Sequence, residues 1–141
     1  MRNSRASLFL MELMISILFF SLSSAVCIQL FVKAHTINET TEYKSSATLI
    51  AQDISEYFHN KCGDKLQLLS YFTEYEADGN NTVLYFTQNG NSCSATSAYY
   101  TATLTFGQDG SFNTLILQVS RTNSNEVLYS SILKKYVPAT L

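Results

Sequence analysis

The 141-residue sequence is poor in glycine, proline and charge. It has five glycines and a single proline, Pro138, so no proline is predicted to break a helix in the apolar N-terminal region. Charged residues make up 14% of the chain, and the formal net charge is −2. Because clustered basic residues are the usual footprint of nucleic-acid binding, no nucleic-acid partner is predicted. A hydrophobic content of 46% excludes a disordered chain, and the length suits one domain.

Residues that carry catalysis or bind metals are equally scarce. His35 and His59 are the only histidines, and His59 precedes Cys62 at a spacing that can bring two ligands onto one helix face. No third ligand and no orienting carboxylate has a matching spacing. The sequence also lacks G-x-S-x-G, H-E-x-x-H, C-x-x-C and phosphate-loop motifs. We therefore predict no catalytic residue, no metal site, no cofactor and no enzyme activity.

The sequence does contain an apolar run from Leu8 to Val32, in which Glu12 is the only charged residue. As a helix this run spans roughly 37 Å, which is enough to cross a bilayer. Arg2 and Arg5 precede the run and Lys33 ends it, a pattern that favours a cytoplasmic N-terminus. The predicted location is the cytoplasmic (inner) membrane, crossed once, with the C-terminal domain outside the cytoplasm.

Two other interpretations of this segment stay open. One is a cleaved secretory signal, because SLSSA (residues 21–25) places small residues before a candidate cut at Val26. The other is a plain signal anchor that holds a monomeric surface-binding domain. Glu12 argues against both, because a charged side chain costs on the order of 2.5–3.5 kcal/mol at the centre of a membrane. Neither a signal nor an anchor needs that carboxylate.

The stretch SLFLMELMISILFF (residues 7–20) resembles the N-terminus of type IV pilins and of the pseudopilins of type II secretion and competence systems. In that family a short basic leader is removed, and a glutamate stands at the fifth position of the mature chain. Placing Glu12 there puts the cleavage site between Ser7 and Leu8 and makes residues 1–7 the leader. Most members have glycine where this chain has Ser7, and phenylalanine where it has Leu8.

The resemblance implies a structural subunit that leaves the membrane to join a cell-surface filament. It also implies the partners, which are other pilin-like subunits, a prepilin peptidase, a polytopic platform protein and an assembly ATPase. The peptidase would cut the Ser7–Leu8 bond, and the new amine would be methylated. Glu12 of one subunit would then meet the Leu8 amine of the next and guide assembly. Ser7 and the low glycine content favour a minor subunit.

The rest of the chain predicts an α+β fold, with a long N-terminal helix packed against a small antiparallel sheet. The membrane-spanning half of this helix, residues 8–33, continues as a soluble amphipathic half, residues 34–62. From residue 63 to 141 the hydrophobic period becomes two, which predicts an antiparallel meander of four or five strands beginning with LQLLSYFTEYE (residues 66–76). The helix stripe should pack on the sheet. Its predicted members are Ile37, Tyr43, Ala47, Ile50, Ile54, Tyr57 and Phe58, facing Leu104, Phe106, Leu115, Leu117, Val119, Val127, Tyr129 and Leu133.

The cysteines suggest one candidate disulfide. Cys27 lies inside the apolar run, where it is expected to behave as a small buried hydrophobic residue. Cys62 and Cys93 are both predicted outside the membrane, where an oxidising compartment permits a bridge. The bridge would close a loop of about 30 residues and contribute on the order of 3–4 kcal/mol in the chain-entropy model.

Two charged groups in the β region are predicted to be solvated, the acidic one as a strand edge and the basic one as the end of the last strand. Glu74, Glu76 and Asp78 alternate along one segment, but their spacing does not match a calcium-binding loop. Lys134 and Lys135 stand near the C-terminus, and two lysines would hold a nucleic-acid backbone only weakly.

Overall fold

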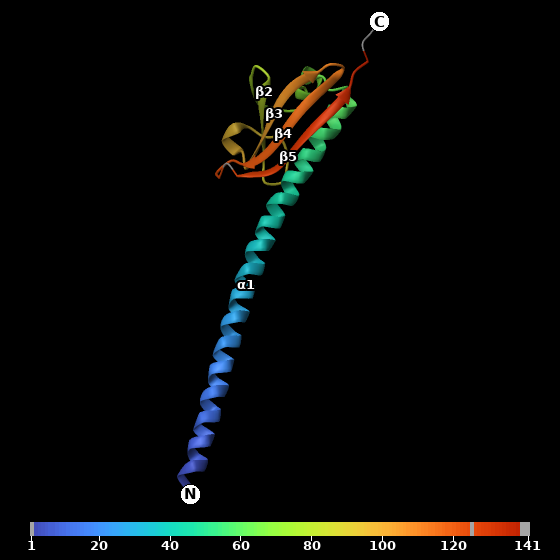
Figure 1. The fold of residues 1–141 in the computed structure, drawn as a ribbon. Helices are drawn as coiled ribbons and strands as arrows, with labels where there is room; N and C mark the ends of the chain where they lie inside the picture. Colours follow the sequence, from blue (N-terminus) through green and yellow to red (C-terminus); the bar gives the residue numbers. More distant parts are fainter. Residues whose placement is uncertain (1, 125, 139–141) are drawn as a thin grey trace. The chain divides into compact units, whose positions relative to one another are not determined.

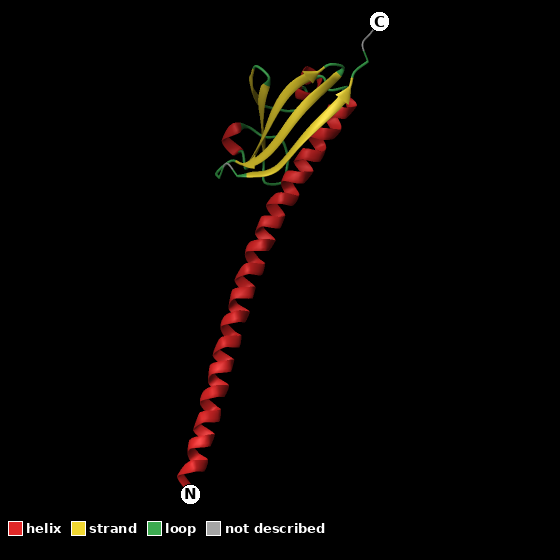
Figure 2. Cartoon of the chain, in the orientation of Figure 1, coloured by secondary structure: helices red, strands yellow, loops and turns green. Residues whose placement is uncertain are grey.

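The computed structural model describes residues 2–124 and 126–138, so Met1 of the predicted leader and residues 125 and 139–141 of the predicted β domain lie outside the described residues. Two helices are followed by a five-stranded antiparallel sheet, which confirms the predicted α+β class (Figures 1 and 2). The elements are α1 (Arg2–Asn60), α2 (Lys65–Leu69), β1 (Tyr75–Asp78), β2 (Asn81–Phe86), a short 3-10 turn (Ala95–Ser97), β3 (Tyr100–Asp109), β4 (Phe112–Arg121) and β5 (Val127–Tyr136).

Internal contacts divide the chain into two units, Met1–Thr41 and Glu42–Leu141. In the first unit, α1 is already helical at Arg2, whereas the apolar pattern predicted a start at Leu8. Residues 2–7 contain no glycine or proline, the two strongest helix breakers, so the helix can extend toward the N-terminus.

In the second unit, α1 ends in a left-handed turn. Cys62 and Gly63 have φ angles of 54° and 76°, and the Gly63 amide donates to the Phe58 carbonyl at 2.9 Å. A bond from an amide to the carbonyl five residues earlier is typical of a Schellman cap, in which the helix ends at a residue in the left-handed conformation, here Cys62. The Asn113 side chain donates to the carbonyl oxygens of Cys62 and Gly63, both at 3.3 Å, and so ties the cap to β4. His59 and Cys62 therefore do not share a regular helix face.

The first predicted strand is partly wrong, because residues 65–69 form helix α2. The Asp64 side chain caps this helix by accepting from the Leu66 amide at 2.9 Å. Leu68 and Leu69 are both buried. Two neighbouring residues can both turn inward on a helix, but a strand with one buried face would expose one of them. Of the predicted stretch, only Tyr75 and Glu76 lie in a strand, β1, which continues to Asp78.

The strands follow one another in the order β1-β2-β3-β4-β5, as Figure 1 shows for the labelled strands. The register of β4 and β5 shifts at Val119 and Ser120, so that Val119 pairs with Tyr129 but Ser120 pairs with Val127. Such a bulge moves one side chain to the opposite face of the sheet. Val127, predicted to face the helix, is therefore 52% exposed, and Leu128 packs against the core instead.

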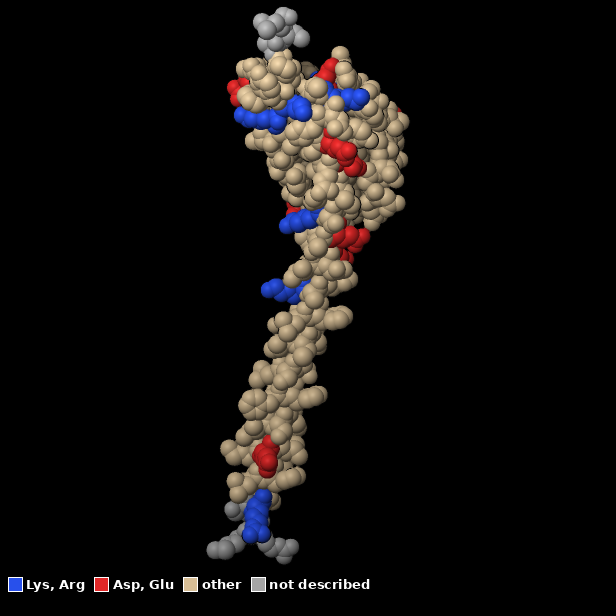
Figure 3. All heavy atoms as spheres, turned by 90° about the vertical axis from the view of Figure 1, so that its right-hand side faces the viewer, with Lys and Arg blue, Asp and Glu red and all other residues tan. Residues whose placement is uncertain are grey.

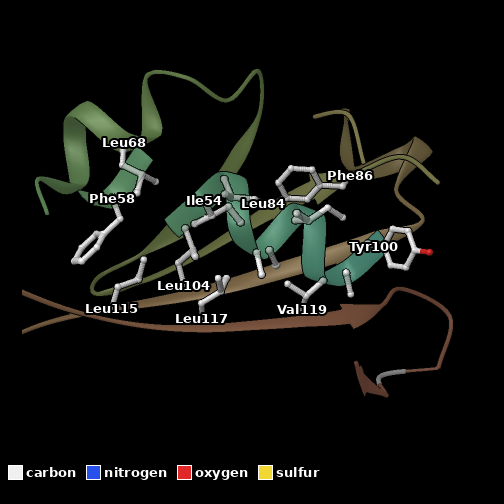
Figure 4. Packing of buried hydrophobic residues seen from close by; sticks show 14 of the residues in the cluster. Ile54, Phe58, Leu68, Leu84, Phe86, Tyr100, Leu104, Leu115, Leu117 and Val119 are labelled. Atoms are coloured by element: carbon white, nitrogen blue, oxygen red, sulfur yellow. The ribbon is translucent and has the colours of Figure 1, made fainter. Parts of the chain in front are cut away.

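The core lies between the second-unit part of α1, helix α2 and one face of the sheet, and Figure 4 shows their side chains converging. Four members of the predicted stripe, Ala47, Ile50, Ile54 and Phe58, are buried. Tyr43 and Tyr57 are only partly buried, and Ile37 in the first unit is exposed. The buried hydrophobic residues are Ala47, Ile50, Ala51, Ile54, Phe58, Leu68, Leu69, Leu84, Phe86, Tyr100, Ala102, Leu104, Leu115, Leu117 and Val119.

An aromatic clamp holds the beginning of the second unit. The Arg121 guanidinium at the end of β4 lies 4.6 Å from the ring centre of Tyr43 on α1 and 5.2 Å from that of Tyr99. Cation–π contacts of this kind add attraction to the packing of the rings. The clamp joins the helix to the sheet at the end opposite the Cys62–Gly63 cap.

Candidate functional site

The first unit presents a continuous apolar surface. From Leu8 to Val32 the large hydrophobic side chains of α1 are exposed on every side of the helix. A soluble helix exposes a polar face, whereas a helix that is apolar all round needs a hydrophobic environment. The helix is long and apolar enough to cross a membrane, as a single-pass anchor requires. Figure 3 shows that few charged side chains interrupt the surface of the N-terminal half of α1.

Glu12 interrupts this surface. Its side chain is exposed, and among the described residues no hydrogen bond or ion pair involves its carboxylate. Only its backbone carbonyl has a side-chain partner, the Ser16 hydroxyl, which donates to it at 2.9 Å. The carboxylate is therefore available to a group outside this chain.

The predicted processing site lies inside α1. Ser7 and Leu8 are both helical and exposed, and Leu8 is 64% exposed. Leu8 precedes Glu12 by one helical turn, which places the two residues on the same side of the helix. An amine created at Leu8 would therefore lie along the same face as the carboxylate.

The cysteines do not form the candidate disulfide in this structure, where Cys27, Cys62 and Cys93 are free thiols. The Cys62 carbonyl accepts from the side chain of Asn113, and Asn113 pairs with Gln108 on β3. The Cys93 amide donates to the carbonyl of Tyr85, and Tyr85 pairs with Thr101 on β3. The seven-residue step from Thr101 to Gln108 covers about 23 Å of strand. A bridge requires Cα atoms within about 7 Å, so the two segments would have to rearrange. Cys27 is exposed and not buried within this chain.

We expect Cys62 and Cys93 to be free in the native protein and to react at different rates. Cys62 is exposed, whereas burial, and then the nearby Glu74 charge, raises the pKa of the Cys93 thiol. A higher pKa leaves less thiolate at neutral pH, so iodoacetamide should label Cys62 several-fold faster than Cys93. Peptide mass spectrometry with and without denaturant measures both rates. A disulfide-linked pair of these two peptides in unreduced protein would contradict the expectation.

The acidic strand β1 is a solvated edge. All four of its residues are exposed, and among the described strands it pairs only with β2. Just before it, the Glu74 carboxylate accepts from the Ala95 amide at 3.3 Å. Partial burial, and then a hydrogen bond with Glu76, raises the pKa of the Tyr85 hydroxyl on β2. No group of three metal-ligating side chains occurs among the described residues.

The basic group lies at the other edge of the sheet. Lys134 on β5 forms an ion pair with Asp109 at 3.2 Å, and both side chains are more than half exposed. Such an exposed pair contributes little to stability. Beyond it, the rings of Phe112 and Tyr136 meet edge to face with centroids 5.4 Å apart.

A polar groove that the sequence did not suggest lies where α1 ends. Its volume is about 680 Å³. The residues around it come from segments far apart in the chain, so no local motif could have indicated it. They include Lys61, Cys62, Gln67, Asn80, Phe106 and Asn113.

Comparisons of this chain with protein-family models, with curated proteins and with solved structures return no match.

Proposed function

We propose that this chain is a pilin-like structural subunit of a type IV pilus, type II secretion or competence filament, and that it is a minor subunit. Its apolar helix would hold it in the cytoplasmic membrane, with the N-terminus in the cytoplasm, until it joins the filament. A prepilin peptidase, a platform protein and an assembly ATPase are the partners this function requires.

The observation that carries the proposal is Glu12. A lone carboxylate on an exposed apolar helix is costly in a membrane unless a positive group meets it. Cutting the Ser7–Leu8 bond supplies such a group as a new amine. In a filament of staggered helices, the amine of one subunit can pair with Glu12 of its neighbour. The cost of an unpaired carboxylate then disfavours other registers.

Processing tests this proposal. In cells that contain the native peptidase, we expect intact-mass measurement and N-terminal sequencing to give a mature chain that starts at Leu8 with a methylated amine. A strain in which the prepilin peptidase has been inactivated is the control, and it should yield the uncut chain. A mature start at Val26 would identify a secretory signal and exclude the pilin-like function.

The groove at the end of α1 favours a second candidate, a monomeric surface-binding domain on a signal anchor. Its polar lining, in which Lys61 and Lys65 occur together with Asp64, suits a small polar ligand. For such a protein Glu12 has no function, and replacing it should leave ligand binding and surface display unchanged.

A further inference from the structure

We propose that the two free edges of the sheet bind each other between copies of this chain, with the basic β5 edge of one copy against the acidic β1 edge of the next. This inference rests on the proposed filament function and specifies a contact between the globular units.

Both edges are open. The sheet order leaves the outer side of β1 and of β5 without a strand partner among the described residues. Unpaired edge groups are a template for another strand, and proteins commonly guard them with charge. Here β5 has lysines only near its C-terminal end, and the preceding stretch Leu128–Leu133 carries no charge.

The charges on the two edges are opposite. Glu76 and Asp78 lie on the four-residue strand β1, while Lys134 and Lys135 lie on β5. Pairing two β1 edges would set acid against acid, which is unfavourable across strands. Pairing β1 with β5 sets acid near base, and this complementarity selects a second copy of the chain as the occupant.

The register across the sheet shows how the charges meet. Asp78 pairs with Asn81, and this row continues through Thr105 and Ile116 to Ile132 on β5. Asp78 is therefore level with Ile132, two residues before Lys134. Sliding a neighbouring copy by about 7 Å along the strands brings Asp78 beside Lys134.

An apolar contribution is available at the same place. Ile132 is 65% exposed beside its cross-strand partner Ile116, which is 40% exposed. A strand docked along β5 would cover part of Ile132 and remove apolar surface from water. The charges then set the register, and this burial adds affinity.

The contact is directional. In an antiparallel meander of five strands, β1 and β5 run in the same direction, so copies in the same orientation bring them together as parallel neighbours. One copy uses β5 and the other uses β1, which leaves a free edge at each end. Such a head-to-tail contact can repeat indefinitely, as a filament requires.

Zero-length carbodiimide cross-linking of the full chain, in its assembled form in its own cells, tests the contact. We expect mass spectrometry to find Lys134 joined to Glu76 or Asp78, in a ladder of dimers and higher multimers. Within one chain this link cannot form, because β1 and β5 are about 19 Å apart across the sheet. The Lys134–Asp109 pair, 3.2 Å apart, is the internal control for reactivity.

Charge-reversal variants provide a second test of the edge contact. Lys134→Glu should reduce the ladder at least tenfold, and so should Glu76→Lys with Asp78→Lys. A chain that carries the changes on both edges should regain the cross-linked ladder. Its β1 edge would then be basic and its β5 edge acidic at position 134, so the charges would again be complementary.

Three results would overturn the inference. Filaments without a β1–β5 link, while the control link forms, would reject the edge contact and leave the proposed function standing. A ladder that persists undiminished in either singly reversed chain would also reject it. A processed, membrane-inserted chain that never assembles would reject the filament function itself, and the edge contact with it.

Discussion

Replacing Glu12 by alanine is expected to leave membrane insertion and cleavage intact while incorporation into filaments falls by at least about 100-fold. Removing one partner of a buried ion pair costs about 3–5 kcal/mol, and each 1.4 kcal/mol is a factor of ten. The folded globular unit should not change, because Glu12 lies in the first unit and no described residue binds its carboxylate. The measurement compares the chain in sheared filaments with the chain left in the membrane.

Matched variants separate charge from shape. Glu12→Gln keeps the side-chain length but removes the charge, so it should behave like Glu12→Ala, whereas Glu12→Asp should retain more assembly. Met11→Ala alters the neighbouring exposed position, 62% exposed, and should assemble normally. Cross-linking between cysteine-substituted neighbours gives a second readout in cells. Equal cross-linking in wild type and Glu12→Ala would show that the carboxylate does not guide assembly.

Replacing Phe58 by alanine is expected to destabilise the globular unit by about 3–5 kcal/mol, the usual cost of truncating a buried phenylalanine. Phe58 is fully buried near the end of α1, and its carbonyl accepts the capping hydrogen bond from Gly63. A loss of this size is a large share of the 5–15 kcal/mol that typically holds a domain folded. Pulse proteolysis of the full chain in membrane vesicles along a urea series measures the shift.

Leu49 supplies the control for this prediction. It lies on the same helix but is 59% exposed, so Leu49→Ala should change the stability by no more than about 0.5 kcal/mol. A urea midpoint for Phe58→Ala as high as that of Leu49→Ala would show that the core does not depend on Phe58. A large loss in Leu49→Ala alone would place a contact on the exposed face of α1.

Residue-level patterns predicted the elements that depend on long periodic segments. The helix stripe from Ala47 to Phe58 and the long strands β3 and β4 were predicted because one face of each is consistently apolar. The prediction failed where periodicity was short or interrupted. LQLL is too short to separate a helix from a strand by spacing, and the Asp64 cap decides the matter. The bulge that turns Val127 outward depends on pairing with β4, which the sequence of β5 does not encode by itself.

By itself the sequence determined the apolar helix, its single carboxylate and the α+β class, because each depends on residue type and local spacing. The tertiary structure decided which segments meet. It separated Cys62 from Cys93, set Arg121 between Tyr43 and Tyr99, and built the groove from distant segments. It also placed an acidic and a basic strand at the two open edges of one sheet. These arrangements follow from strand order and register, which are fixed by packing between residues far apart in the chain.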